Sequence, residues 1–233
     1  METKIRKIQT AIFTKNFNIS NDLDRAALLT EINNHADAIF DGVPTQLPIP
    51  NDVPPEIPRF ILNSADGRFN CHIALSRVDI FYNVPVDYAG TCEELFETQR
   101  TNIQNIFTFL VGKDIVVNRI GFITIAEEIL ESADGSGLAY LKGSFIQSDK
   151  FSKPKELIFN YNRSGRSENF DMNNLITVSA NEKVNTKILL QTDINTTAEI
   201  INADTNFNVE NFNEIINYVV RETKGFLDGF PNI

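Results

Sequence analysis

The sequence of this protein predicts an α+β fold with a large, mainly antiparallel sheet. Three observations predict it: strand patterns run from Asp114 to Ile194 with no helix pattern between them, amphipathic helix patterns occur at three other places, and Asp-Gly and Ser-Gly pairs mark hairpins. The expected order is strand, helix, two strands, helix, then about five strands and a C-terminal helix. A chain of 233 residues can bury one sizeable core, so we expect a single domain, 1–233, or two half-domains, 1–112 and 113–233, that share one sheet.

The first half is expected to begin with a strand and a helix. Ile5 to Ile19 has the apolar side chains of a strand, and Ser20 and Asn21 offer N-caps for a helix that ends near Gly42. The apolar stripe of this helix consists of Leu28, Ile32, Ala36 and Ile39. Six prolines fall between Pro44 and Pro58, a density that no helix or central strand accepts, so an extended surface connection follows.

A hairpin and a second helix complete this half. The tetrapeptide Ser64-Ala65-Asp66-Gly67 separates the alternating runs Arg59 to Asn63 and Arg68 to Asn83, which predicts a hairpin. Thr91 and Glu94 then form a capping box for a helix that ends at Gly112. Its buried stripe is expected at Leu95, Phe96, Ile103, Phe107 and Leu110.

The second half is expected to be a meander closed by a helix. The segment from Asp114 to Ile125 has apolar residues at both its odd and its even positions, which predicts a central strand covered on both faces. Turns are expected at Asp134-Gly135, Ser164-Gly165 and Ala180 to Glu182. The strands between them are expected at Leu138 to Phe145, Leu157 to Arg163, Leu175 to Ser179 and Val184 to Ile194. Asn208 caps the last helix, and no internal sequence repeat is evident.

Composition and charge exclude several classes of protein. The net charge of -10 argues against a general nucleic-acid binder, because phosphate affinity comes from Lys and Arg. The apolar runs are far shorter than the roughly 20 residues of a membrane-spanning helix, and Met1 to Lys7 has no apolar targeting segment. Cys71 and Cys92 have no C-x-x-C spacing, as expected of reduced thiols. We therefore expect a cytoplasmic protein without a membrane or nucleic-acid partner.

The residues also offer little catalytic chemistry. The densest acidic group is Glu127, Glu128, Glu131 and Asp134, but it lacks the ligand spacing of an EF-hand loop and predicts a solvated acidic turn. His35 and His72, the two imidazoles, are expected on helix and strand surfaces. The glycines around Ser136 are expected in a turn between strands, and the chain has no Gly-Lys-Ser/Thr loop. We expect no metal, no cofactor and no catalytic residue, and we favour a protein that is not an enzyme.

Three polar residues are the best candidates for a ligand site. Arg119 stands inside an otherwise apolar strand, where an arginine needs a partner or a cavity. The first possibility makes Arg119 part of a structural ion pair. The second makes Arg77, Asn83 and Arg119 a candidate ligand-binding site beside the sheet.

Two segments of the chain carry a resemblance to a known family. They run from Pro58-Arg59-Phe60 to Asp79-Ile80-Phe81-Tyr82-Asn83, and from Leu190-Gln191-Thr192-Asp193-Ile194 to Gly225-Phe226-Leu227. The chain resembles a sporadically distributed bacterial family of uncharacterised proteins, although the tryptophan that such proteins often carry near the equivalent of Asn83 is absent. The resemblance implies this length and order of elements. The patchy distribution of the family is similar to that of mobile genes for defence or toxin control.

These observations favour a non-enzymatic interaction protein of bacterial or phage origin. The 27 asparagines and the absence of tryptophan are typical of an A+T-rich coding source. Unpaired strand edges offer pairing sites, so we expect a protein partner or self-association through an exposed sheet face or edge, as in an accessory component of a defence or toxin-control system. A small-molecule or nucleotide-binding enzyme or sensor that uses Arg77 and Arg119 is one alternative. A chaperone-like holder of unfolded chains is another, and it predicts a continuous apolar groove.

Overall fold

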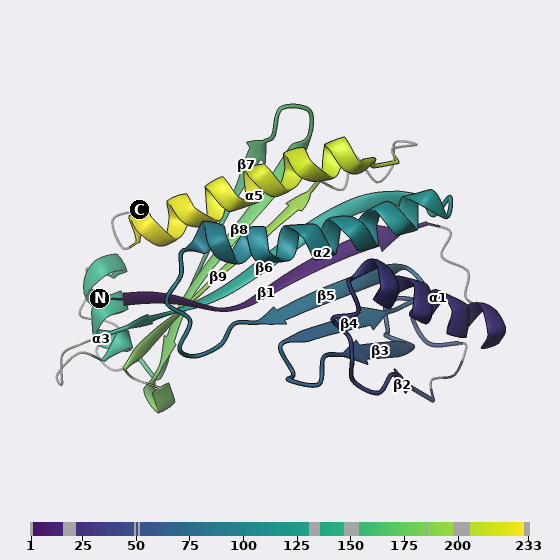
Figure 1. The fold of residues 1–233 in the computed structure, drawn as a ribbon. Helices are drawn as coiled ribbons and strands as arrows, with labels where there is room; N and C mark the ends of the chain where they lie inside the picture. The colour runs from purple at the N-terminus through teal and green to yellow at the C-terminus, as the bar shows by residue number, and fades with distance from the viewer. Residues whose placement is uncertain are drawn as a thin grey trace.

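The computed structural model describes residues 2–15, 22–48, 50, 52–130, 136–146, 154–184, 186–197 and 206–230. Within these residues nine strands form one antiparallel sheet in the order β2-β3-β4-β5-β1-β6-β9-β8-β7. Helices α1, α2 and α5 lie on one face of this sheet (Figure 1). The expected α+β class with a large antiparallel sheet is therefore confirmed. None of the described helices is both long enough and apolar enough to cross a membrane.

The two halves of the chain repeat one topology. The first half contains β1 (Glu2–Thr14), α1 (Asp22–His35), β2 (Thr45–Gln46), β3 (Phe60–Asn63), β4 (Phe69–Ile73), β5 (Arg77–Asn83) and α2 (Cys92–Gly112). The second half contains β6 (Val117–Ile129), α3 (Gly137–Phe145), β7 (Glu156–Arg166), β8 (Asp171–Asn181), β9 (Lys187–Thr196) and α5 (Val209–Gly229). In each half the first strand lies at the centre of the sheet and pairs with the last strand, and the other two long strands continue outward.

The core lies between the sheet and the two long helices. β1 and β6 pair in the middle, where Ile8 lies opposite Thr124 and Ile12 opposite Ile120. Side chains alternate between the faces of a strand, so Ile8, Ile12 and Ile120 point toward the helices, where all three are fully buried. Phe107 of α2 stacks on Phe212 of α5 with ring centroids 4.9 Å apart. This contact joins the helices of the two halves, and each such buried ring contributes about 2–3 kcal/mol.

Both long helices begin at capping boxes. In α2, Glu94 N donates to Thr91 Oγ1 at 3.2 Å, and Thr91 N donates to Glu94 Oε2 at 2.8 Å, which confirms the expected box. In α5, Asn208 is the N-cap as expected, and Asn211 returns the second hydrogen bond. The hairpin turn at Ser64 to Gly67 is also confirmed, with Gly67 in the left-handed region at φ 72°.

The expectation of uninterrupted strands after Asp114 is wrong. The segment expected as a strand from Leu138 to Phe145 is helix α3, and Ser136 is its N-cap, accepting a hydrogen bond from Ala139 N at 3.1 Å. Leu138 and Leu141 lie three residues apart and are buried on one side of the helix. An apolar run this short does not distinguish a helix from a strand.

The turn expected at Ser164-Gly165 is also wrong. Both residues belong to β7 and pair with Asn173 and Met172 of β8. The reversal occurs instead between Ser167 and Phe170, where Ser167 N donates to Phe170 O at 2.9 Å. Gly165 has a different role: a Cβ added there would lie 1.8 Å from Tyr218 Oη, so the glycine lets α5 approach β7.

Other expectations change at the ends of elements. β1 ends at Thr14 instead of Ile19, and α1 ends at His35, before Gly42, because Asp37 and Ala38 adopt φ values of 53° and 55°. The proline-rich connection contains the short strand β2, paired with β3. The expected caps at residues 20 and 21 and the turn at residues 134 and 135 lie outside the described residues.

Within the part of the chain that the structure describes, helices cover one face of the central strand β6 and not the other (Figure 1). Ile120, Phe122 and Ala126 are buried beneath α2 and α5, whereas Ile123 and Ile125 of the opposite face are half-buried. The expectation that this strand is covered by structure on both faces is therefore wrong. Its second set of apolar side chains is shielded by neighbouring strands, because Ile125 lies opposite Lys7 and Gln191.

Candidate functional site

Two of the three candidate ligand residues meet on the face of the sheet opposite the helices. Arg77 and Arg119 lie on either side of Phe13, to which both are register partners, with guanidinium carbons 5.8 and 4.9 Å from the ring centroid. Arg77 Nε lies 2.7 Å from Asp79 Oδ2, an ion pair whose angles are not those of a hydrogen bond. Asp79, itself buried, also accepts from Gln9 Nε2 at 3.0 Å.

Arg119 is held by neutral groups. Its Nη2 donates to Asn195 Oδ1 at 3.0 Å, and Asn195 Nδ2 donates in turn to Asp193 Oδ1 at 3.0 Å. Among the described residues Arg119 has no carboxylate within ion-pair distance, so the expected structural ion pair is replaced by an amide and an aromatic ring. These contacts occupy both arginines with partners from the sheet itself.

Asn83 does not join this group. It lies at the other end of β5, opposite Lys7, and its Nδ2 donates to Gly67 O at 2.9 Å. Six residues of strand separate it from Arg77, about 20 Å along the chain. Asn83 therefore fastens the β3–β4 turn, and the three candidates do not form one site.

The histidines and cysteines make packing contacts. His35 stacks on Phe109 of α2 with centroids 4.8 Å apart, and His72 lies 4.6 Å from Phe81, where burial lowers its pKa. Burial also raises the pKa of the Cys71 thiol, and burial with the charges of Glu93 and Asp228 raises the pKa of Cys92 to about 12. Both thiols are thus protonated at neutral pH, when neither is a good nucleophile.

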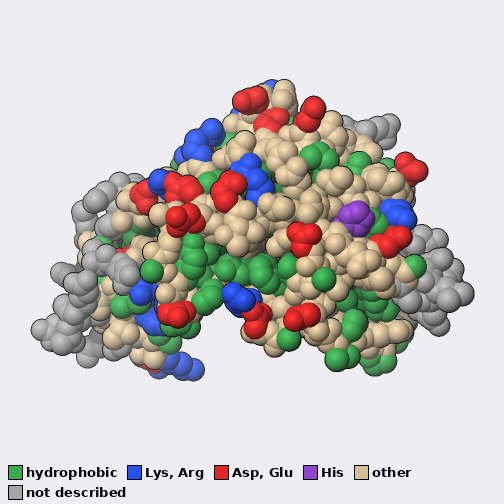
Figure 2. Space-filling model, viewed as in Figure 1, with side chains coloured by type: hydrophobic (Ala, Val, Ile, Leu, Met, Phe, Trp, Pro, Cys, Tyr) green, Lys and Arg blue, Asp and Glu red, His purple; other side chains and the backbone are tan. Residues whose placement is uncertain are grey.

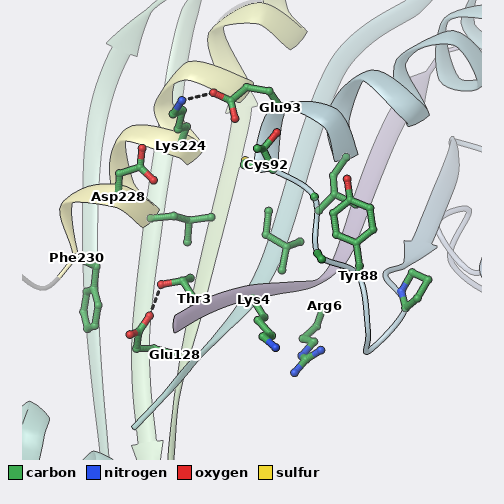
Figure 3. Close-up of a pocket in the computed structure, with 17 residues that line it drawn as sticks. Thr3, Lys4, Arg6, Tyr88, Cys92, Glu93, Glu128, Lys224, Asp228 and Phe230 are labelled. Carbon is green, nitrogen blue, oxygen red and sulfur yellow. Dashed lines mark hydrogen bonds and ion pairs between the residues drawn. The ribbon is translucent and has the colours of Figure 1, made fainter. Parts of the chain in front are cut away.

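A polar cavity of about 660 Å³ lies where four distant segments of the chain meet (Figure 3). Thr3 of β1 and Glu128 of β6 form one side, Cys92 marks the start of α2, and Asp228 belongs to the last turn of α5. The side chain of Lys224 on α5 forms an ion pair with Glu93 across the top of the cavity. Local sequence patterns do not predict this site, because its residues come together only through the pairing of β1 with β6 and the packing of α2 against α5.

Charged side chains of both signs line this cavity: Glu93, Glu128 and Asp228 are acidic, and Lys4, Arg6 and Lys224 are basic. Figure 2 shows acidic and basic side chains side by side near the C-terminal end of α5. Burial and the nearby charge of Glu94 raise the pKa of Tyr88, which lines the opposite side of the cavity. Burial, followed by the charge of Glu128, raises the pKa of Tyr140 on α3. Burial, followed by the charge of a neighbouring glutamate, thus disfavours the ionised form of both tyrosines.

An apolar groove of about 790 Å³ lies between α5 and the outer strands β7 and β8. Aromatic side chains from three elements line it, including Phe145 of α3, Phe159 and Tyr161 of β7, and Phe226 of α5. Tyr161 is 56% exposed although it points toward the helix side of the sheet, where it pairs in register with the buried Ile176. Arg163 and Arg221 stand at the rim, and both form ion pairs with Glu222.

The comparisons with known proteins add no functional information. No protein-family model matches this chain, and no curated protein matches its sequence. The resemblance to the sporadic bacterial family therefore stays a prediction. In the described part of the chain no group of three or more His, Cys, Asp or Glu side chains is placed to hold a metal ion.

Proposed function

We propose that this protein is an interaction module that binds a helical segment of a partner protein in the groove between α5 and β7. The observation that carries the proposal is a difference between two equivalent places in the repeated topology. In the first half α1 packs its buried Ile32 into the core, and the buried Ala36 follows directly after the helix. In the second half the equivalent connection contains the short α3, and the groove stays open among the described residues.

The chemistry of the groove indicates what kind of segment it accepts. Its floor is aromatic and aliphatic, which suits the apolar side of an amphipathic helix with anchors three or four residues apart. Its rim presents two arginines and one glutamate in a protein of net charge -10, so it is locally basic. The partner helix is therefore expected to carry acidic residues beside its apolar stripe.

The neighbouring edge supports the same surface. β7 pairs only with β8, and its outer edge meets no other described strand over eleven residues. Such an edge is a pairing site unless it is covered. A partner seated in the groove would lie directly beside this edge and shield it.

A matched pair of substitutions tests the proposal. Tyr161 and Ile158 lie on the same strand with similar exposures of 56% and 54%, but only Tyr161 lines the groove. We expect Tyr161→Glu to abolish capture of a stoichiometric partner from the native host and Ile158→Glu to retain it, as measured by quantitative mass spectrometry. The purified partner should contain an acidic amphipathic helix whose synthetic peptide binds the wild-type protein and not the Tyr161 variant.

Several results would contradict this function. A partner captured equally by both variants would place the interface elsewhere. Light scattering that shows a dimer, lost in Tyr161→Glu, would identify the occupant as a second copy of this chain. A monomer that captures no protein under native conditions would leave the interaction proposal without support and would favour the small-molecule alternative.

A further inference from the structure

The two edges of the sheet, as the described residues form it, differ in how they are protected against pairing. β2 forms one edge with only two residues, and Pro44 and Pro48 stand on either side of it in the sequence. Short strands and prolines are common means by which an edge avoids pairing with another chain. β7 forms the other edge with eleven residues and contains neither proline nor lysine. The second edge is therefore free of these protective features.

β7 also has the regular shape that pairing requires. Its residues pair one to one with those of β8, from Glu156 opposite Asn181 to Arg166 opposite Asp171, without a bulge. A strand of eleven residues is about 36 Å long, and an antiparallel partner forms about ten backbone hydrogen bonds with it. This is the number of hydrogen bonds in a typical protein interface.

The charges of β7 are complementary to those of a second, antiparallel β7. When Tyr161 lies opposite its own copy, Glu156 of each chain lies opposite Arg166 of the other. Both charged side chains are exposed and point to the sheet face opposite the helices. Arg166 Nη1 already lies 3.1 Å from Asp171 Oδ1 on β8, so pairing would place this guanidinium between two carboxylates.

The helix side of β7 favours the same register. There Phe159 of each chain lies opposite Arg163 of the other, where a guanidinium can lie against an aromatic ring. A shift of two residues in either direction separates Glu156 from Arg166, and a larger shift toward the C-terminal end of β7 sets Arg163 opposite its own copy. The register centred on Tyr161 pairs all eleven residues and opposes no like charges.

We propose that two copies of this chain form a dimer by pairing β7 with β7 about a two-fold axis at Tyr161. The axis is perpendicular to the sheet, which continues from one copy into the other, so the helices and the apolar grooves of both copies lie on the same side. The dimer does not rest on the proposed partner helix, because it uses the backbone edge of β7 and charges on the opposite face.

An exchange of charges tests the pairing, with analytical ultracentrifugation at low ionic strength as the measurement. The wild type should be a dimer. Glu156→Lys and Arg166→Glu each set like charges opposite one another at both ends of the interface, and each should raise the dissociation constant at least about tenfold. In an equimolar mixture each introduced charge meets its opposite in the other chain, so a mixed dimer should form with about the wild-type affinity. Glu97→Lys, the same charge change at an exposed residue of α2, should have no effect.

Disulfide formation tests the register independently. Tyr161 and Ile158 have similar exposures of 56% and 54%, but only Tyr161 lies opposite its own copy. Ile158 lies opposite Ser164, which separates the two Ile158 positions by about 20 Å. Under copper phenanthroline oxidation, Tyr161→Cys should therefore give a covalent dimer, whereas Ile158→Cys should not.

Three results would overturn the proposal: a wild type that is monomeric at about 100 μM, a dissociation constant that charge exchange leaves unchanged, or equal cross-linking of the two cysteine variants. Neither Glu156 nor Arg166 lines the apolar groove. A monomeric Glu156→Lys variant that still captures a partner therefore supports both proposals, and one that captures none counts against the groove alone. A dimer that resists charge exchange but is lost in Tyr161→Glu would place the second copy in the groove and not at the edge.

Discussion

The two halves of this protein have the same strand order, but the outer strands are covered in the first half and partly open in the second. In the first half the outer strand β3 turns Phe60 and Leu62 to the helix side, and both are buried. In the second half the equivalent strand β7 turns Phe159 and Tyr161 to the same side, and Tyr161 stays largely exposed. One topology therefore gives a closed edge and an open one.

Two features account for the closed edge. The proline-rich connection adds β2 to the outside of β3, and Leu47 N donates to Arg59 O at 2.9 Å beyond it. Helix α1 then packs against α2, where Glu31 forms an ion pair with Lys113 and His35 stacks on Phe109. The second half has neither addition among its described residues. The fold can therefore cover its outer strands, as the first half does. The open edge at β7 is for this reason a candidate binding surface.

The contact between the halves should show the largest effect. Phe212→Ala removes a fully buried ring that stacks on Phe107, and we expect a loss of about 3–5 kcal/mol in the free energy of unfolding. If the halves form one cooperative unit, denaturant unfolding followed by circular dichroism and by tyrosine fluorescence gives a single coincident transition. Two separate transitions would instead favour two half-domains over a single domain.

One substitution in α1, which covers the outer strands of the first half, can be compared with one in the open groove of the second half. Ile32→Ala in α1 creates a cavity at a fully buried position and should cost about 2–4 kcal/mol. Tyr161→Ala in the open groove should cost less than about 1 kcal/mol, because the side chain is already in water. Urea denaturation of the free protein measures both. A large cost at Tyr161 would mean that the groove is occupied within the molecule.

The close approach of α5 to β7 predicts an effect of intermediate size. Gly165→Ala places a methyl group against the buried Tyr218 hydroxyl, which accepts from Asn174 Nδ2 at 2.7 Å, and should cost about 1–3 kcal/mol. Gly143→Ala in α3, where a Cβ meets nothing within 4 Å, should instead be neutral or stabilising by about 0.5–1 kcal/mol. Equal effects in thermal denaturation would contradict the steric explanation.

Local signals in the sequence predicted the elements that depend on neighbouring residues. The capping box of Thr91 and Glu94 marks α2, and the Asp-Gly pair in the first hairpin marks its turn, because both act within a few residues. The turn predicted at Gly165 is wrong because this glycine makes room for Tyr218, a residue that is distant in sequence. The repeated topology has no sequence signature either, since the halves share strand order without sharing residues.

The candidate sites depend on pairings that the sequence does not specify. Arg77 and Arg119 meet because β5 and β1, and β1 and β6, pair with a register that puts both opposite Phe13. Asn83 belongs to the same strand as Arg77, but strand geometry separates the two. The acidic residues from Glu127 to Asp134 predict a solvated turn, whereas Glu128 belongs to β6 and is buried.

The two hairpin turns should differ slightly in their response to acid. In the first half, hydrogen bonds from Arg68 N and Ser64 Oγ lower the pKa of Asp66 to about 2. In the second half, burial alone would raise the pKa of Glu214 on α5, but hydrogen bonds from Ser167 and Asn169 outweigh it and hold the pKa below its usual value. Each carboxylate therefore stabilises its turn above the unfolded-state pKa, about 4 for both residue types, and this contribution disappears as the pH falls through the folded-state pKa.

Protonation of Asp66 and of Glu214 can be followed separately in the two turns. Asp66 should hold its turn down to about pH 2, and the turn at Ser167 to Phe170, which is tied to α5, should loosen as the pH falls below the usual pKa range of a glutamate. Amide chemical shifts of Arg68 and Asn169, followed by NMR between about pH 5 and pH 2, report the two turns separately. Glu214→Gln should remove the transition at Asn169 and leave that at Arg68 unchanged. Loss of both transitions in Glu214→Gln would show that the two turns are coupled through the sheet. It would contradict the prediction that they respond to acid independently.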